Sequence, residues 1–105
     1  MSEDVVTLSA VVRAREGKEA LVEAALAEVV RWVEAQEPQT LAYYVGRESD
    51  DPLVFTTFER YANKGALELH NASSALDRFS KAVADSLAGP VEIRICREIA
   101  VAAAR

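Results

Sequence analysis

Residues 54–70, VFTTFERYANKGALELH, decide the fold of this chain, because they join a strand signal directly to a helix signal. The first half, up to Tyr61, is rich in β-branched and aromatic residues, which favour a half-buried strand. A polar spacer with a glycine follows, and good helix formers then lead to His70, the only histidine of the chain. We predict a strand followed by a short helix, with Glu59, Tyr61 and His70 able to meet on one side of a sheet.

On the N-terminal side of this stretch, the pattern predicts two strands separated by a long helix. Val5–Arg13 alternates in the manner of a strand, and Lys18–Gln36 carries apolar residues at the spacing of an amphipathic helix. Thr40–Arg47 reads as a second strand. The turn signal SDDP that follows predicts a hairpin between this strand and Leu53–Tyr61.

On the C-terminal side, the pattern predicts one more helix and a last strand. Ser73 or Ser74 can cap the helix, whose apolar residues recur at helical spacing until Gly89-Pro90 ends it. Val91–Val101 then has apolar residues at alternate positions, which predicts a strand.

The resulting order is β-α-β-β-α-β, which predicts a ferredoxin-like α+β plait: an antiparallel sheet with its helices on one face, in a single domain over residues 1–105. In the first strand, Val6, Leu8, Ala10 and Val12 would face the helices. The other face of that strand is too apolar to remain in contact with water. We therefore expect a homodimer that forms through the uncovered sheet face.

Composition and charge exclude several classes of protein. Half of the residues are hydrophobic and the net charge is −5, which argues against disorder, nucleic acid binding and attraction to anionic membranes. The N-terminus MSEDVV carries no secretory signal, so we expect a cytoplasmic protein. Cys96 is predicted to be a buried free thiol, and one Cys with one His cannot supply a zinc site of the usual type, so no metal is expected.

Residues 58–79, FERYANKGALELHNASSALDRF, resemble the signature of the antibiotic biosynthesis monooxygenase domain family. In that signature a strand ends in Glu-x-aromatic, a small spacer follows, and Ala-Leu-x-x-His precedes a Ser. The matching residues here are Glu59, Tyr61, Ala66, Leu67, His70 and Ser73 or Ser74. The resemblance implies the dimeric α+β barrel of that family over nearly the whole chain.

Members of this family include cofactor-independent monooxygenases of phenols, quinols and anthrones. The resemblance therefore implies an enzyme without a cofactor that uses molecular oxygen to oxidise quinol-like or polycyclic phenolic substrates. The substrate would be a small aromatic or phenolic compound held between the sheet and the helices. Many relatives carry a second His after the Ser, where this chain has Ala75-Leu76. The residues that the haem-degrading branch uses are also unmatched, since Ala10, Tyr61 and Ser80 stand near those positions. The alternative is a non-catalytic module of the same barrel superfamily that binds a small apolar ligand.

A cofactor-free oxygenase must deprotonate an electron-rich substrate, orient it and exclude water. His70 is the candidate proton acceptor, and Tyr61 is the candidate hydroxyl that orients the substrate oxyanion. The candidate substrate-binding residues on the same strand are Phe55, Thr57, Phe58 and Glu59.

Each of these residues also has a structural alternative. His70 could cap the end of its helix, and Tyr61 could be a core aromatic. Glu59 could pair with Arg60, Arg47 or Arg97 rather than act on a substrate.

Overall fold

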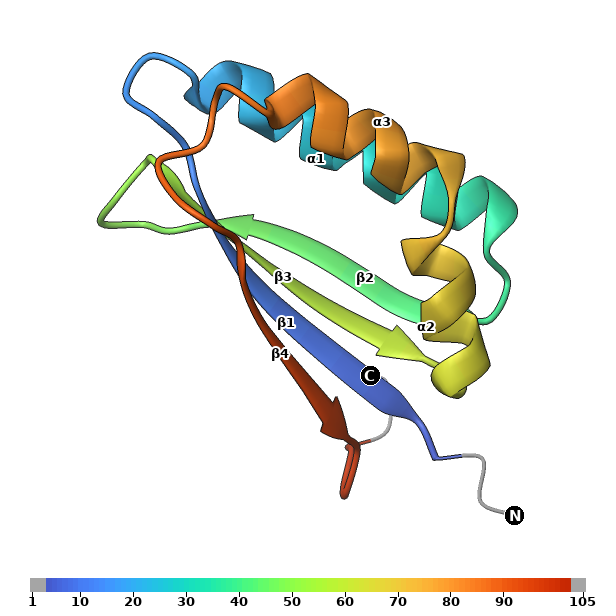
Figure 1. Cartoon of the computed structure of the whole chain (residues 1–105). Helices are drawn as coiled ribbons and strands as arrows, with labels where there is room; N and C mark the ends of the chain where they lie inside the picture. Colours follow the sequence, from blue (N-terminus) through green and yellow to red (C-terminus); the bar gives the residue numbers. More distant parts are fainter. Residues whose placement is uncertain (1–3, 103–105) are drawn as a thin grey trace.

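The computed structural model describes residues 4–102 and has the element order β-α-β-β-α-α-β (Figure 1). The elements are β1 (Val6–Arg13), α1 (Glu19–Gln36), β2 (Thr40–Arg47), β3 (Val54–Tyr61), α2 (Lys64–Asn71), α3 (Ser74–Val83) and β4 (Glu92–Arg97). The four strands form one antiparallel sheet in the order β2-β3-β1-β4. α1 and α3 cover one face of it, so the predicted ferredoxin-like α+β fold is confirmed. The single domain predicted for residues 1–105 includes three residues at each end that lie outside the described part.

Alternation along the central strands decides which side chains face the helices. In β1, Leu8, Ala10 and Val12 are buried, as the pattern predicted. In β3, the odd-numbered residues from Phe55 to Tyr61 are all buried, whereas Thr56 and Phe58 are exposed. The buried face of β3 is therefore the floor of the layer between the sheet and the helices.

The long helix α1 is amphipathic and buries one row of valines and a leucine against the sheet. The row consists of Val22, Leu26, Val29 and Val33. Gly17 precedes the helix with φ +85°, a left-handed conformation that glycine adopts at little cost. Within residues 4–102, no helix has both the length and the apolarity needed to cross a membrane.

Two side-chain caps fix the short helix α2, which carries His70. The Asn63 side chain accepts a hydrogen bond from the Ala66 backbone N–H at 2.9 Å. At the other end, Ser73 Oγ donates to the carbonyl of His70 at 2.7 Å and accepts from the Leu76 N–H at 3.3 Å. Ser73 thereby joins the last turn of α2 to the first turn of α3. Of the two predicted caps of α3, the structure uses Ser73.

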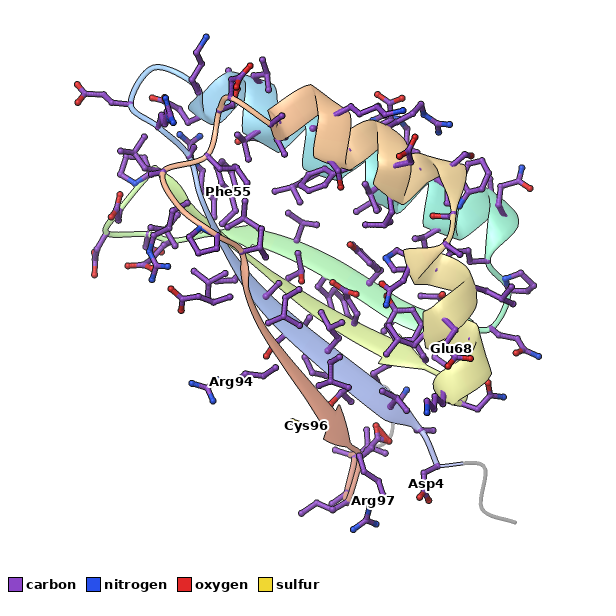
Figure 2. All side chains as sticks on the ribbon, viewed as in Figure 1. Asp4, Phe55, Glu68, Arg94, Cys96 and Arg97 are labelled. Carbon is purple, nitrogen blue, oxygen red and sulfur yellow. The ribbon has the colours of Figure 1, made fainter. Side chains whose placement is uncertain are left out.

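The C-terminal part of the chain differs from the prediction in three respects. α3 ends at Val83, because the chain turns there and Leu87 forms a bridge with Ala14 next to β1. β4 covers only Glu92–Arg97, and all six of its residues are exposed because the helices do not extend over this edge of the sheet. Cys96 is therefore exposed and not buried (Figure 2).

Candidate functional site

A buried carboxylate lies near the end of the covered face of β3. Glu59 is only 4% exposed, and its two oxygens accept hydrogen bonds from neighbouring hydroxyls. Thr57 Oγ1 donates to Oε2 at 2.7 Å, and the Tyr61 hydroxyl donates to Oε1 at 2.5 Å. These contacts arise because residues two apart on a strand point to the same side.

His70 enters the same region from α2 and lies between two carboxylates. Its side chain is 2% exposed, and its Nδ1 is 2.9 Å and 3.1 Å from the two carboxylate oxygens of Glu37. Its Nε2 is 4.0 Å from Glu59 Oε1, which is longer than a hydrogen bond. The three side chains form a carboxylate–imidazole–carboxylate line that joins the end of α1 to β3.

Glu37, at the C-terminal end of α1, is held by two further donors. Trp32 Nε1 donates to Oε2 at 3.0 Å, and Thr40 Oγ1 donates to Oε1 at 2.8 Å. The Glu37 side chain is 12% exposed, and it lines a groove of about 470 Å³ on the outside of the molecule, together with Pro38 and Leu69. The Glu37 end of this carboxylate–imidazole–carboxylate line therefore lies close to solvent.

Two tyrosines pack beside the imidazole. The ring centroids of Tyr43 and Tyr61 are 5.3 Å and 5.4 Å from that of His70. Burial, followed by the charge of Glu59 and hydrogen bonding to it, raises the pKa of both phenols well above the usual value. Both hydroxyls therefore remain protonated at neutral pH and act as neutral hydrogen-bond donors.

The polar groups line one corner of a small cavity between the sheet and the helices. The cavity has a volume of about 90 Å³. Its polar corner is formed by Tyr43, Thr57, Glu59 and His70, with Asn71 nearby. Its other walls are aliphatic or aromatic, and it extends to Val91 and Ile93, where Ile93 is 54% exposed. The volume is smaller than the roughly 300–1,000 Å³ typical of ligand pockets.

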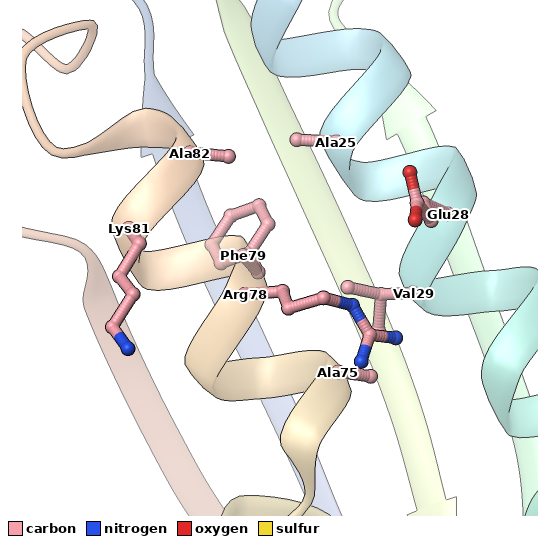
Figure 3. Close-up of a pocket in the computed structure, with 8 residues that line it drawn as sticks. All are labelled: Ala25, Glu28, Val29, Ala75, Arg78, Phe79, Lys81 and Ala82. Carbon is pink, nitrogen blue, oxygen red and sulfur yellow. The ribbon is translucent and has the colours of Figure 1, made fainter.

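Phe79 separates this cavity from a larger groove on the outside of the helix layer. The groove lies between α1 and α3 and has a volume of about 470 Å³ (Figure 3). Phe79 and Val29 line both the inner cavity and the outer groove. A rotation of the Phe79 side chain would therefore change the space available beside the polar corner.

The candidate residues from the sequence are distributed over three places. His70, Thr57 and Glu59 meet at the cavity, and Tyr61 is fully buried behind them with its hydroxyl directed at Glu59. Phe55 lies between the sheet and the helices, but it packs at the other end of β3 in an apolar cluster with Val12, Ala14, Val22, Leu26 and Val83 (Figure 2).

Phe58 does not lie near the cavity, contrary to its predicted place among the substrate-binding residues. It points to the uncovered face of the sheet, is 42% exposed and stacks on Tyr44 with ring centroids 6.4 Å apart. The reason is the alternation of β3, which sends residue 58 to the side opposite residues 57 and 59.

The partners that the structural alternatives named for His70 and Glu59 are not the ones observed, whereas Tyr61 packs in a core cluster as its alternative predicted. The His70 ring binds Glu37 and not the final carbonyls of its helix. Glu59 interacts with hydroxyls and an imidazole, whereas Arg60, which points to the other face, makes a bidentate pair with Glu98 at 2.7 Å and 2.8 Å.

Sequence reasoning did not identify Glu37 and Tyr43 as members of the site. One signal was present, since a carboxylate at a helix C-terminus faces the negative end of the helix dipole and is unfavourable there without a partner. Within residues 4–102, no group of three or more His, Cys, Asp or Glu is arranged to hold a metal ion.

The fold and the buried acid–imidazole cluster define a ferredoxin-like α+β protein with an internal polar site. The family model for antibiotic biosynthesis monooxygenases matches residues 5–82. The chain therefore belongs to the antibiotic biosynthesis monooxygenase family. No curated protein matches the sequence.

Solved structures show the same fold at low sequence identity. A Caulobacter crescentus protein described as a "putative antibiotic biosynthesis monooxygenase" has a TM-score of 0.87 at 22% identity, over 93% of this chain and 92% of that one. A Pseudomonas aeruginosa protein has a TM-score of 0.83 at 26% identity, over 92% and 96%. A Mycobacterium tuberculosis protein has a TM-score of 0.86 at 21% identity, over 94% and 99%.

Proposed function

We propose that this protein is a cofactor-independent monooxygenase that oxidises quinol-like or phenolic aromatic compounds with molecular oxygen. The observation that carries the proposal is the imidazole of His70, buried between Glu37 and Glu59 at the polar corner of an otherwise apolar cavity. An apolar cavity can hold an aromatic ring, and the polar corner can receive its hydroxyl group.

In the proposed reaction, His70 Nε2 takes the proton of the substrate hydroxyl, which leaves an electron-rich phenolate. The phenolate gives one electron to dioxygen, and the resulting radical and superoxide combine to form a C–O bond. The imidazolium returns its proton to the peroxide anion. Loss of the ring C–H proton then breaks the O–O bond, so that one oxygen atom becomes a quinone carbonyl and the other leaves in water.

The other residues of the site assist this step without exchanging protons with the substrate. Tyr61 and Thr57 donate to Glu59 and hold its carboxylate in place, so Tyr61 orients the site through Glu59. Glu59 in turn favours the imidazolium that forms 4.0 Å away. The apolar walls exclude water from the reduced oxygen species.

The cavity volume favours a single-ring substrate over a polycyclic one. About 90 Å³ is less than the roughly 150 Å³ of an apolar cavity that binds benzene, so even one aromatic ring would fill it and displace its walls slightly. Phe79 would have to move before a larger ring system could enter, because it closes the cavity toward the outer groove. Phe79→Ala is therefore expected to extend activity toward bicyclic and tricyclic phenols.

The test is oxygen uptake with a panel of hydroquinones, naphthoquinols and anthrones. We expect turnover with the smaller members, loss of turnover in His70→Ala, and normal turnover in Glu68→Ala, an exposed change on the same helix. The proposal fails if no member is oxidised by the wild-type protein. In that case, saturable binding of an apolar ring compound without turnover would support the alternative, a non-catalytic binding module, which the small cavity also fits.

We also propose that the protein forms a homodimer through the uncovered face of its sheet. This face carries the exposed stacked pair of Tyr44 and Phe58 next to the half-buried Val11. Aromatic groups are enriched at interfaces between protein subunits, and a second sheet packed face to face would cover them. Light scattering should give twice the chain mass at micromolar concentration, and Phe58→Arg should shift the mass to that of one chain. A wild-type monomer would contradict the dimer.

A further inference from the structure

The Glu37 side chain takes no part in the reaction proposed above, although it is in direct contact with His70. It lies outside the cavity, yet both of its carboxylate oxygens approach His70 Nδ1, at 2.9 Å and 3.1 Å. It is the C-terminal cap residue of α1, and the last turn of this helix contains no basic residue. The helix dipole therefore opposes a negative charge at this position.

Three donors offset that unfavourable position. Trp32, Thr40 and His70 all direct a polar atom at the Glu37 carboxylate. A carboxylate at an electrostatically unfavourable position, with a full set of hydrogen-bond partners, is expected at a functional site more often than elsewhere. The partners come from α1, β2 and α2, so the carboxylate is fixed relative to all three elements.

These contacts also determine the tautomer of His70. An indole N–H can only donate, and the threonine hydroxyl also directs its proton to Glu37, so both carboxylate oxygens act as acceptors. Nδ1 of His70 must then carry a proton and donate it to Glu37. In the neutral imidazole this leaves the lone pair on Nε2, the nitrogen that faces Glu59 and the cavity.

We propose that Glu37 is the positioning residue of this site: it holds His70 with the lone pair of Nε2 toward the cavity, and it stabilises the imidazolium that forms when a substrate proton arrives. The proposal rests on the proposed function for its kinetic consequence. The tautomer of His70 does not depend on that function. Glu37 itself touches neither substrate nor oxygen.

The kinetic test compares Glu37→Gln with Glu34→Gln, an exposed change one turn earlier on the same helix. We expect Glu37→Gln to lower kcat by about 10- to 100-fold, the loss that is typical when the partner that orients a metal-ligating histidine is removed. KM should change less than about twofold, because Glu37 does not line the cavity. Glu34→Gln should leave both constants unchanged. Equal losses in the two variants, or a change in KM alone, would overturn the positioning role.

A second kinetic test uses the outer groove beside Glu37. In Glu37→Ala the space of the missing carboxylate opens to this groove of about 470 Å³. Added formate should therefore restore part of kcat in Glu37→Ala, whereas it should not stimulate the wild-type protein or His70→Ala. The absence of rescue in a folded Glu37→Ala protein would count against the proposal.

The structural test needs no substrate and uses the fact that the chain has a single histidine. In the nitrogen-15 spectrum of the wild-type imidazole, Nδ1 should carry a slowly exchanging proton. This proton should exchange faster and shift upfield in Glu37→Gln. An unprotonated Nδ1 in the wild-type protein overturns the proposal even if no variant folds.

The two kinds of test also separate the two proposals. If the wild-type protein oxidises nothing but Nδ1 is protonated and sensitive to Glu37, the monooxygenase function fails and the positioning of His70 stands. If turnover is present and Glu37→Gln alters neither kcat nor the Nδ1 proton, the function stands and the role of Glu37 fails.

Discussion

The two ends of the buried face of β3 differ sharply in chemistry although they belong to one strand. At the apolar end, Phe55 is 1% exposed and packs in a cluster of buried aliphatic residues, with the Arg47 guanidinium 5.3 Å from its ring centroid. At the polar end, Tyr61 is equally buried, but it donates to Glu59 beside His70. The apolar end stabilises the fold by packing. The polar end holds charged and polar groups that need partners and leaves a small cavity beside them, an arrangement that suits a reactive site more than it suits stability.

Phe55→Ala should cause the largest loss of stability among the variants that distinguish the two ends of β3. Removing a fully buried aromatic ring from the apolar end should lower the free energy of unfolding by about 3–5 kcal/mol. Urea denaturation measures this loss. Leu69→Ala, at a position that is 72% exposed, is the control and should change stability by less than about 0.5 kcal/mol. A loss below about 1 kcal/mol in Phe55→Ala would mean that the apolar end contributes less than its packing implies.

Alkaline pH should weaken the polar end selectively. The pKa values of Tyr43 and Tyr61 are raised in the folded protein, so the unfolded chain loses these protons first as pH rises above about 10. Each tyrosine should then lower stability by about 1.4 kcal/mol per pH unit, and below that pH the contribution is fully present. Urea denaturation between pH 9 and pH 11 should show this slope.

The matched variant for this pH effect is Tyr43→Phe combined with Tyr61→Phe. It lacks both phenols, so its stability should fall less steeply over the same pH range. Parallel curves for the wild-type and the double variant would show that burial beside Glu59 does not control the two phenols.

Asn63→Ala should have a smaller effect, again at the polar end. It removes the hydrogen bond to the Ala66 N–H that begins α2, and the loss of such a cap typically costs about 1 kcal/mol. Amide exchange should become faster in α2, whereas α1 should be unaffected. Lys64→Ala, exposed and next in the chain, is the control. Unchanged exchange in α2 would mean that Ser73 alone fixes the position of His70.

The smallest expected effect is a change in thiol reactivity on the uncovered face of the sheet, which lies opposite both buried ends of β3. Cys96 pairs across the sheet with Thr7 on that face, and it is exposed in the single chain. In a dimer formed through this face, the thiol should react slowly with a disulfide reagent and faster after Phe58→Arg. Equal rates in both proteins would place the subunit contact elsewhere.

Much of the fold could be predicted because its signals are local. The alternation of β1, the 18-residue helix α1 and the polar turn before β3 depend on neighbouring residues alone. The end of the chain could not be predicted in the same way. The apolar alternation of residues 91–101 is a normal strand signal, but whether helices cover that edge depends on where α3 ends.

The site could be predicted only in part for a similar reason. The motif identified Glu59, Tyr61 and His70, and strand alternation brings Thr57 to the same side. Phe58 could be excluded only once the face of β3 that meets the helices was known. Glu37 lies 33 positions from His70, and no local pattern links residues so far apart.

The order of the strands, the buried face of β1 and the family could be inferred from the sequence alone, because periodicity, turn residues and a short motif are properties of neighbouring residues. The tertiary structure alone decided that Glu37 meets His70, that Tyr61 directs its proton to Glu59, and that a cavity of only about 90 Å³ remains beside them. Those features arise where the end of α1, the face of β3 and the last turn of α2 come together. Their positions are fixed by long-range packing.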